Sequence, residues 1–464
     1  MPLVVSSPSR PGPAPSEPAG SAPWARPRLA VRVTRDALRQ IRGGHPWVFD
    51  RSVTSVRGAG RAGDLAVVFD DRRRFAAIGL YDPDSPVAVR LLHRGSPETI
   101  DQSWLDARFA AALQRREPVR TGPETTTGFR LVHGENDGLG GLVVDHYDGT
   151  SVIKVYTAAW LPWLDAVVAS LHALAGPGSP GSAPAFRHDR AVLRLARRVG
   201  SAPGAGDHPP ARRGRAPGGA GDGPVLDGPV LDGSVLDGSV LAGPVRFREA
   251  GLEMEADVVR GHKTGHFFDQ RENRLLIRHH SHGRRVLDVF SCTGGFALNA
   301  AVGGASSVVA TDRSRAALAT LRANFAHNGL AAGPGPAGPA TIEGDAFEVM
   351  ARLAGEGRRF DLVVVDPPSF AQRARQVRGA LDGYRRLARL AAGLVAPDGL
   401  LFQASCSSRV DEDAFVAAME AGLADAGYRS RLVAATGHAA DHPVDFAFGA
   451  YLKARLVRPV PVRR

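Results

Sequence analysis

The C-terminal half of the chain alternates short apolar runs with segments of helical periodicity. A short apolar run bounded by turn residues is typical of a buried strand, and apolar positions three and four residues apart are typical of a helix. Strands alternating with helices predict an α/β fold built on a doubly wound parallel sheet. The expected strands are Val286–Phe290, Ser307–Thr311, Ala340–Glu343, Asp361–Val365 and Gly399–Ala404, the expected helices are Phe296–Val302, Ala316–His327, Phe347–Leu353, Leu381–Leu394 and Asp411–Ala426, and two further strands are expected at Arg429–Ala434 and Phe446–Leu456.

The N-terminal half has a different pattern. Between residues 27 and 98, apolar alternations such as LAVRV and DLAVVFD are separated by Gly, Asp and Pro turns, which predicts a small β-rich domain. Residues 99–199 combine strand patterns with a helical pattern at Trp160–Leu174 and a possible strand at Val192–Leu195, which predicts a central α/β domain. The larger α/β domain would then occupy residues 245–464.

Two segments lack a packing pattern. Residues 1–26 are rich in Pro, Ser and Ala and are expected to be disordered. Residues 200–244 run from a Gly/Pro-rich block into the repeat GPVLD-GPVLD-GSVLD-GSVLA. Because this period matches neither a helix nor a strand, we interpret residues 200–244 as a low-complexity insertion without packed structure.

Composition narrows the class of protein. Of 464 residues, 23% are charged and 44% hydrophobic, which is ordinary for a soluble globular protein. No apolar run is long enough for a membrane helix, the N-terminus does not resemble a signal peptide, and the chain has only 2 cysteines, so we expect a cytoplasmic protein. The net charge of +11 suits a polyanionic partner, but the dominance of arginine is equally typical of a GC-rich genome.

Candidate binding residues follow the expected strands of the C-terminal domain. The first strand contains Asp288 and leads into the turn Ser291-Cys292-Thr293-Gly294-Gly295. Such a turn lets the backbone approach a ligand closely, although a plain strand-to-helix turn has the same composition. Asp312 and Asp345 follow the next two strands, where an acid either holds a ligand or caps a helix. The arrangement of acids at successive strand ends resembles that of class I S-adenosylmethionine-dependent methyltransferases.

Two later strands end in residues suited to covalent chemistry. Asp366-Pro367-Pro368 forms a rigid turn after one strand, and Cys406 follows the other. A thiolate that adds to carbon 6 of a pyrimidine makes carbon 5 nucleophilic, and this role requires an accessible thiol with a lowered pKa. The plainer alternatives are a strand-terminating turn for the Asp-Pro-Pro segment and a structural residue for Cys406. Phe370 either stacks on a base or joins the core, and Cys292 is better explained as structural.

These motifs together identify the chain as similar to the large-subunit ribosomal RNA cytosine-5 methyltransferase family. The resemblance rests on the Asp366 and Cys406 motifs and on four other segments, GHPWVF at 44–49, RLVHGENDGL at 130–139, GHKTGHFFDQR at 261–271 and DHPV at 441–444. It implies a PUA-like RNA-binding domain, a central α/β domain and a Rossmann-like class I methyltransferase domain. It also implies S-adenosyl-L-methionine as cofactor and ribosomal RNA, specifically 23S, as partner.

The resemblance assigns roles to individual residues. Cys406 would be the nucleophile, and Asp366 would hold the cytosine ring. Cofactor binding would fall to Asp288, Phe290, Thr293, Gly294, Asp312, Asp345, Ala346, Asp366 and Gln270, and RNA contact to Pro367, Pro368, Phe370, Lys263, Arg72 and Arg73.

Some points of the resemblance stay open. Arg72 and Arg73 either contact RNA or form a solvated surface, and Trp47 and Phe49 either stack on a base or belong to the β core. No metal is expected, and a homodimer is possible. Ser369 stands where some relatives carry a second cysteine that serves product release, so the group that removes the carbon-5 proton is unassigned. Cys292 also replaces an expected aromatic residue.

Two other functions are compatible with the motifs. Methylation of a guanine amine uses a similar Asp-Pro-Pro loop and needs no thiol. An RNA-binding protein that has lost catalysis would keep the fold, but the complete set of strand-end acids argues against it.

Overall fold

The N-terminal part of the protein is a six-stranded sheet. The structure is a computed structural model that describes residues 22–175, 186–196, 199, 232–261, 263–330, 338–371, 373–446 and 449–462. The sheet has the order β2-β6-β5-β4-β1-β3, and helix α1 packs on its apolar side chains. The elements are β1 (Leu29–Val33), α1 (Arg35–Arg42), β2 (Trp47–Phe49), β3 (Val53–Arg57), β4 (Leu65–Phe69), β5 (Phe75–Tyr81) and β6 (Val87–Arg94), with short 3-10 turns at Pro23–Ala25 and Asp50–Ser52.

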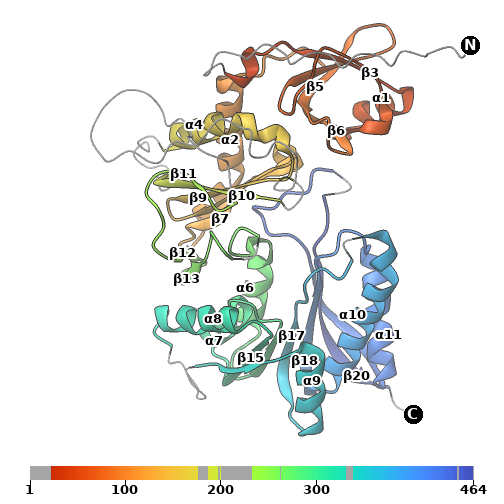
Figure 1. The fold of residues 1–464 in the computed structure, drawn as a ribbon. Helices are drawn as coiled ribbons and strands as arrows, with labels where there is room; N and C mark the ends of the chain where they lie inside the picture. Colours follow the sequence, from red (N-terminus) through yellow and green to blue (C-terminus); the bar gives the residue numbers. More distant parts are fainter. Residues whose placement is uncertain are drawn as a thin grey trace, which may run out of the picture.

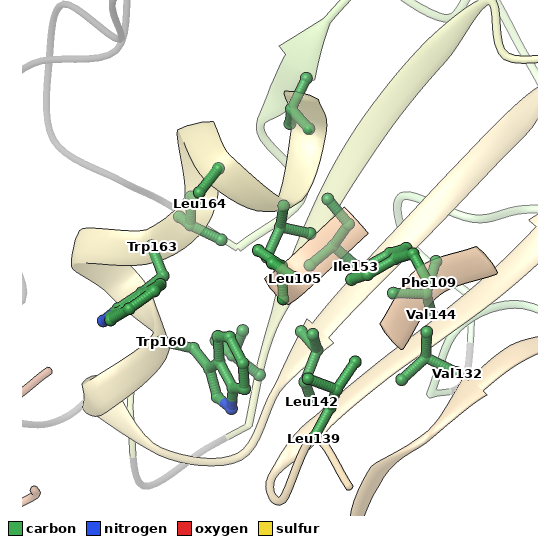
Figure 2. Close-up of a cluster of buried hydrophobic side chains, with 14 of the residues drawn as sticks. Leu105, Phe109, Val132, Leu139, Leu142, Val144, Ile153, Trp160, Trp163 and Leu164 are labelled. Carbon is green, nitrogen blue, oxygen red and sulfur yellow. The ribbon is translucent and has the colours of Figure 1, made fainter. Parts of the chain in front are cut away.

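The central part is a five-stranded sheet of order β11-β10-β9-β8-β7. Helices α2 and α4 cover one face, and Figure 2 shows Leu105 and Phe109 of α2 packed with Ile153 and with Trp160 and Trp163 of the turn before α4. The elements are α2 (Gln102–Arg115), α3 (Glu117–Arg120), β7 (Gly128–His133), β8 (Leu142–Tyr147), β9 (Thr150–Val155), α4 (Leu164–Leu174), β10 (Arg190–Leu195) and β11 (Val235–Asp237), with 3-10 turns at Gly134–Asp137 and Ala158–Trp163.

The C-terminal part is a seven-stranded sheet of order β16-β15-β14-β17-β18-β20-β19, preceded by the hairpin β12–β13. The first five strands in this order are parallel, and β20 is antiparallel to both β18 and β19. The elements are β12 (Val245–Glu249), β13 (Leu252–Ala256), α6 (Arg271–His279), β14 (Arg285–Val289), α7 (Gly295–Val302), β15 (Ser307–Asp312), α8 (Arg315–His327), β16 (Ala340–Glu343), α9 (Ala346–Gly355), β17 (Phe360–Val365), α10 (Val377–Ala392), β18 (Val395–Ser405), α11 (Glu412–Asp425), β19 (Tyr428–Thr436) and β20 (Lys453–Pro461), with 3-10 turns at Phe268–Gln270 and Ala374–Gln376.

Helices cover both faces of this sheet. Helices α6, α7 and α8 lie on one face and helices α9, α10 and α11 on the other (Figure 1). This is the predicted doubly wound α/β arrangement, and its expected strands and helices are present with ends shifted by a few residues, apart from the last strand. No helix among the described residues is long and apolar enough to cross a membrane.

Two expectations about ordered structure are wrong in part. Pro23–Ala25 form a helical turn, and Trp24 packs on Trp163 with ring centroids 5.8 Å apart, so order begins before residue 26. Within the segment expected to lack packed structure, β11 pairs with β10 and buries Leu236. A single Val-Leu-Asp unit suffices for a short edge strand, whatever the period of the repeat. Residues 1–21 and 200–231 lie outside the described residues.

The last predicted strand begins later than expected. β20 starts at Lys453, whereas the sequence pattern placed its start at Phe446. The backbone N–H groups of Tyr451 and Leu452 donate to Nε2 of His438 at 3.2 and 3.1 Å, so they are not available to a sheet. Phe446 instead packs against Trp47 of the N-terminal part, with ring centroids 5.8 Å apart.

Candidate active site

The strand order of the C-terminal sheet reverses between β14 and β17. From β14 the chain continues outward through β15 and β16, and from β17 it continues in the opposite direction through β18. In open parallel sheets, ligands bind at the carboxyl ends of the strands where the order reverses. Asp288, Asp312, Asp366 and Cys406 all lie on or directly after these strands.

The turn after β14 is unusually tight. Phe290, Cys292 and Gly294 have positive φ angles of 62°, 49° and 84°. A Cβ atom on Gly294 would lie 2.4 Å from Cγ of Leu321, so only glycine fits there. Phe290 packs at the edge of the buried cluster that contains Ala346, and the carbonyl of Thr293 accepts from Nδ2 of Asn324 at 2.9 Å. The turn is therefore held in place from both sides.

Asp288 lies beneath this turn and is fully buried. Its Oδ2 accepts from the backbone N–H of Ala297 at 2.9 Å, whereas its Oδ1 is buried and has no hydrogen-bond partner. Burial raises the pKa of this carboxyl well above its ordinary value, and the charges of Asp366 and Asp312 act in the same direction. An unpartnered buried oxygen at this place is available to a bound ligand.

The two acids that follow β15 and β16 differ in their present partners. The Asp312 carboxylate accepts from the backbone N–H of Cys292 at 2.9 Å and of Ser314 at 2.8 Å. Asp345 is the N-cap of α9, and its Oδ1 accepts from the N–H groups of Phe347 and Glu348 at 3.0 and 3.4 Å. Each carboxylate accepts hydrogen bonds from the backbone and keeps lone pairs that can accept from a ligand. Both predicted roles, helix capping and ligand binding, are therefore compatible with the structure.

Asp366 directly follows β17, at the point where the strand order reverses. Its Oδ1 accepts from Nε2 of Gln270 at 2.8 Å, which connects the loop after β17 to the segment before α6. Burial, together with the charge of Asp269, raises the pKa of Asp366 to about 7. The carboxyl therefore exchanges a proton readily at neutral pH.

Cys406 meets the same loop from the neighbouring strand. Its Sγ, half-buried, donates to the carbonyl of Pro367 at 3.8 Å. Burial and the charge of Asp366 raise the pKa of this thiol to about 12, whereas Lys263 acts to lower it. The expectation of a lowered pKa is therefore wrong for the protein without bound RNA.

Serine and tyrosine hydroxyls behind Cys406 fix its loop. Oγ of Ser407 lies 3.0 Å from the Tyr384 hydroxyl and 3.1 Å from Oγ of Ser369, and Oγ of Ser405 donates to Tyr384 at 2.8 Å. Ser369 thus helps to join the loop after β17 to the Cys406 loop.

Sequence reasoning missed Lys453, a buried cation that also holds this loop. Its Nζ donates to the carbonyls of Ser407 at 2.6 Å and of Val410. The chain has only three lysines among 58 basic residues. All three lie at or near the candidate site. Lys453 holds the Cys406 loop, and the charge of Lys263 lowers the pKa values of Asp366 and Cys406. Lys154 donates to the carbonyl of Lys263 at 3.4 Å. Their rarity was a signal in the sequence.

A buried acid beside Asp366 was also missed. Asp269 accepts from the hydroxyl of Tyr451 at 2.8 Å, and its Oδ1 is buried without a hydrogen-bond partner. Burial alone would raise the pKa of Asp269, but the charges of Lys263, His442 and Arg130 outweigh it and lower that pKa. An ionised Asp269 explains part of the raised pKa of Asp366.

The expected RNA contacts are spread over two places. Near Cys406, Pro367 is buried, Pro368 is exposed, and the ring of Phe370 packs on Tyr384 with centroids 5.2 Å apart, which favours a packing role. Arg72 lines a hollow of about 600 Å³ together with Arg35, Arg39 and Arg42 of helix α1. Arg73 follows Arg72 in the same turn. The aromatic residue Trp47 is half-buried and donates to Oε1 of Glu135 at 2.8 Å, so it joins the N-terminal and central parts.

Comparisons with known proteins establish the family of the chain. Residues 31–94 match the family described as PUA-like domain, and residues 236–456 match the family described as S-adenosylmethionine-dependent methyltransferase. A ribosomal RNA large subunit methyltransferase of Deinococcus radiodurans is 42% identical over 443 residues, which cover 95% of this chain and 98% of the relative. The chain belongs to this methyltransferase family. The ribosomal RNA large subunit methyltransferase I of Photobacterium profundum is 32% identical over 91% of this chain and 98% of its own length.

The fold of this methyltransferase is also found in solved structures. The structure of a candidate SAM-dependent methyltransferase from Streptococcus mutans superposes on this fold with a TM-score of 0.71. The match covers 92% of this chain and 99% of the other chain, at 18% sequence identity. A candidate methyltransferase complexed with SAH covers 93% of this chain with a TM-score of 0.72. The protein is thus a class I methyltransferase with a PUA-like domain, and S-adenosylmethionine is its methyl donor.

The turn after β14 and the acids beside it fit this cofactor. The turn without a Cβ at Gly294, the carboxylate of Asp312 and the unpartnered Oδ1 of Asp288 offer the close backbone approach and the acceptors that an adenosyl group and an amino-acid tail require.

Proposed function

We propose that this methyltransferase methylates carbon 5 of a cytosine in large-subunit ribosomal RNA through a covalent adduct with Cys406. The observation that carries the proposal is the contact of the Cys406 thiol with the carbonyl of Pro367 in the Asp366-Pro367-Pro368 loop. This contact places the only thiol outside the cofactor turn against the loop expected to hold the target base. The names of the relatives from Deinococcus radiodurans and Photobacterium profundum support the choice of ribosomal RNA.

Asp366 and Cys406 act together in the proposed reaction. As the sulfur forms a bond to carbon 6, the thiol proton passes to the Asp366 carboxylate, which delivers it to N3 of the cytosine. The negative charge of Asp366 raises the pKa of the thiol, and this effect disappears once Asp366 is neutral. The Lys263 ammonium lowers the pKa of the thiol further. S-adenosylmethionine supplies the methyl group that carbon 5 accepts. The carbon-5 proton is then lost to solvent and the C6–S bond breaks. The proton on N3 returns through Asp366 to the departing thiolate, and the aromatic ring is restored.

The N-terminal sheet offers a surface for the RNA backbone. Arg35, Arg39, Arg42 and Arg72 line the hollow described above, and Asp36, Asp70 and Asp71 hold several of these guanidinium groups by ion pairs. Arginine forks bind phosphate oxygens well, and a PUA-like domain bearing such a hollow is suited to a structured RNA. Binding of RNA phosphates would thus account for part of the positive charge of the chain.

The test uses the purified protein, S-adenosylmethionine and ribosomal RNA from a strain that lacks the gene. We expect 5-methylcytidine by mass spectrometry of nucleosides, and we expect Cys406→Ala to lower kcat/KM by on the order of 10³-fold or more. RNA that carries 5-fluorocytosine cannot lose a carbon-5 proton, so it should trap a protein–RNA adduct on a denaturing gel with the unaltered protein and not with Cys406→Ala.

Ser408→Ala is the matched control, because Ser408 is exposed in the same loop. It should retain activity. Full activity of Cys406→Ala would exclude the covalent mechanism and favour methylation of a guanine amine. Absence of S-adenosylmethionine binding in calorimetry would instead indicate an RNA-binding protein without catalysis.

A further inference from the structure

Three side chains with metal-binding atoms meet at the edge of the central sheet. His172 lies in the last turn of α4, His188 lies just before β10, and Asp237 is the last residue of β11 (Figure 1). Their ligand atoms all lie within 4.8 Å of one another. Nε2 of His172 is 2.9 Å, and Nε2 of His188 is 3.3 Å, from Oδ2 of Asp237. None of these residues takes part in the methyltransferase site.

The distances fit a tetrahedral metal site. With metal–ligand bonds of about 2.0–2.2 Å, two ligands of a tetrahedral zinc ion lie roughly 3.3–3.5 Å apart. The contact of His188 with Asp237, at 3.3 Å, has this separation, and that of His172, at 2.9 Å, is shorter by a few tenths of an ångström. His172 is the most exposed of the three, so its ring has room to complete the geometry, and the ion can reach the site from solvent.

The state of His188 is the second observation. Its side chain is fully buried, and its Nε2 faces Oδ2 of Asp237 at 3.3 Å without the geometry of a regular hydrogen bond. Its Nδ1 lies 3.3 Å from Oγ of Ser151. Histidines that bind metals commonly make such a contact with the other ring nitrogen, which fixes the ring and leaves Nε2 to the ion.

The neighbouring His146 fixes one side of Ser151. Burial lowers the pKa of His146 to about 3, so its ring is neutral. Its Nε2 accepts from the backbone N–H of Gly149 at 3.3 Å, and its Nδ1 therefore donates to Ser151 across 3.3 Å. The Ser151 oxygen retains a lone pair that can accept from Nδ1 of His188, which leaves the lone pair of Nε2 directed at the three-residue cluster.

We propose that His172, His188 and Asp237 bind one zinc ion. Two imidazoles and a carboxylate are ligands that suit zinc, and three protein ligands leave the fourth position to water. The ion would tie the edge strand β11, which the sequence led us to expect as part of an unpacked insertion, to α4 and to the segment before β10. No metal was expected from the sequence, because residues 172, 188 and 237 have no spacing that signals a site.

Calorimetry with zinc chloride on the untagged, chelator-treated protein tests the proposal. We expect saturable binding of one zinc per chain and a higher Tm with zinc. Asp237→Asn and His188→Gln should each weaken binding by roughly 100-fold or more and abolish the rise in Tm, because loss of a ligand costs at least as much as loss of a supporting contact. His279→Gln is the control, since His279 and His280 form an adjacent pair of rings, 5.1 Å apart, away from the cluster.

Cobalt(II) added to the unaltered protein gives a second readout that needs no variant. A tetrahedral site of nitrogen and oxygen ligands should give visible d–d absorption without a thiolate charge-transfer band. Equal weakening by His279→Gln and His188→Gln, a thiolate band that assigns the ion to a cysteine, or no saturable binding would each overturn the proposal. The last result would mean that the two histidines only donate hydrogen bonds to Asp237.

Discussion

Two carboxyl groups at the ends of one strand show how surroundings decide the chemistry of a residue. Asp361 lies near the start of β17 and Asp366 directly after its end. The hydrogen bonds and charge of Arg285 lower the pKa of Asp361, whereas burial and Asp269 raise that of Asp366 to about 7. Both residues are aspartates next to the same strand, but only Asp366 has a pKa suited to proton transfer at neutral pH.

Asp366→Asn should therefore stabilise the protein at pH 8. A carboxyl ionises near pH 4 in the unfolded chain, and Asp366 ionises near pH 7 in the folded chain, so stability falls as the pH rises between these values. Asn carries no charge and escapes this loss. We expect Tm of the variant to exceed that of the unaltered protein by roughly 2 °C or more at pH 8, and the difference to shrink towards pH 5.

Asp361→Asn provides the control of opposite sign. Its lowered pKa stabilises the folded chain above the unfolded pKa, so the substitution should lower Tm at pH 8 and have less effect as the pH falls towards 3. Thermal unfolding across this pH range would contradict the argument if both variants changed in the same direction.

At the scale of elements, the strand–turn–helix unit from β14 to α7 concentrates the local constraint. Three residues of the turn adopt positive φ, and the Asp288 carboxylate holds the first turn of α7 through Ala297. Non-glycine residues with positive φ are costly and persist where the surroundings hold them. The turn is thus shaped before any ligand arrives.

Gly294→Ala should disrupt this turn. Its Cβ would lie 2.4 Å from Cγ of Leu321, and we expect a cost of about 1–3 kcal/mol beyond the conformational cost, with weaker binding of S-adenosylhomocysteine. Gly329→Ala is the matched control, because Gly329 has φ +70° and no atom within 4 Å of an added Cβ. Urea unfolding and calorimetry compare the two. Equal destabilisation and unchanged ligand binding would show that the close approach to Leu321 does not matter.

At the scale of the whole molecule, the three parts share their cores. Leu65 and Ile78 of the N-terminal sheet belong to the cluster under α2 and α4, and Tyr147 and Val152 of the central sheet belong to a cluster with Phe402 of the C-terminal sheet. The motif segments at 130–139, 261–271 and 441–444 meet between the central and C-terminal parts. The contacts of Arg130 and Arg271 with Asp441 therefore join these parts.

Asp441 is the centre of that junction. It is fully buried, and its Oδ2 accepts from Arg271 at 2.9 Å and from the backbone N–H of Arg130 at 2.8 Å. Asp441→Ala should lower the free energy of unfolding by on the order of 3–5 kcal/mol, because it leaves Arg271 buried without a carboxylate partner at this oxygen. Denaturant titration measures the change.

Glu343→Ala is the control for Asp441→Ala, since Glu343 forms an exposed pair with Arg315 at 2.9 Å. Such a pair contributes about 0–1 kcal/mol. A loss in Asp441→Ala no larger than that in Glu343→Ala would mean that the junction is not held by this carboxylate.

The sequence by itself determined the elements and the places where chemistry could occur. Apolar periodicity is a local property, so it located the strands of the C-terminal sheet and put Asp288, Asp312, Asp366 and Cys406 at their ends. Short edge strands such as β11, and the late start of β20, depended on partners distant in the chain and were not predicted.

Only the tertiary structure decided the state of those groups. The raised pKa values of Asp366 and Cys406, the hold of Lys453 on the Cys406 loop and the meeting of His172 with His188 and Asp237 all come from residues far apart in sequence. Burial and through-space charge set a pKa, and neither is a local property of the chain. The sequence could therefore name Cys406 as the candidate nucleophile but not its protonation state.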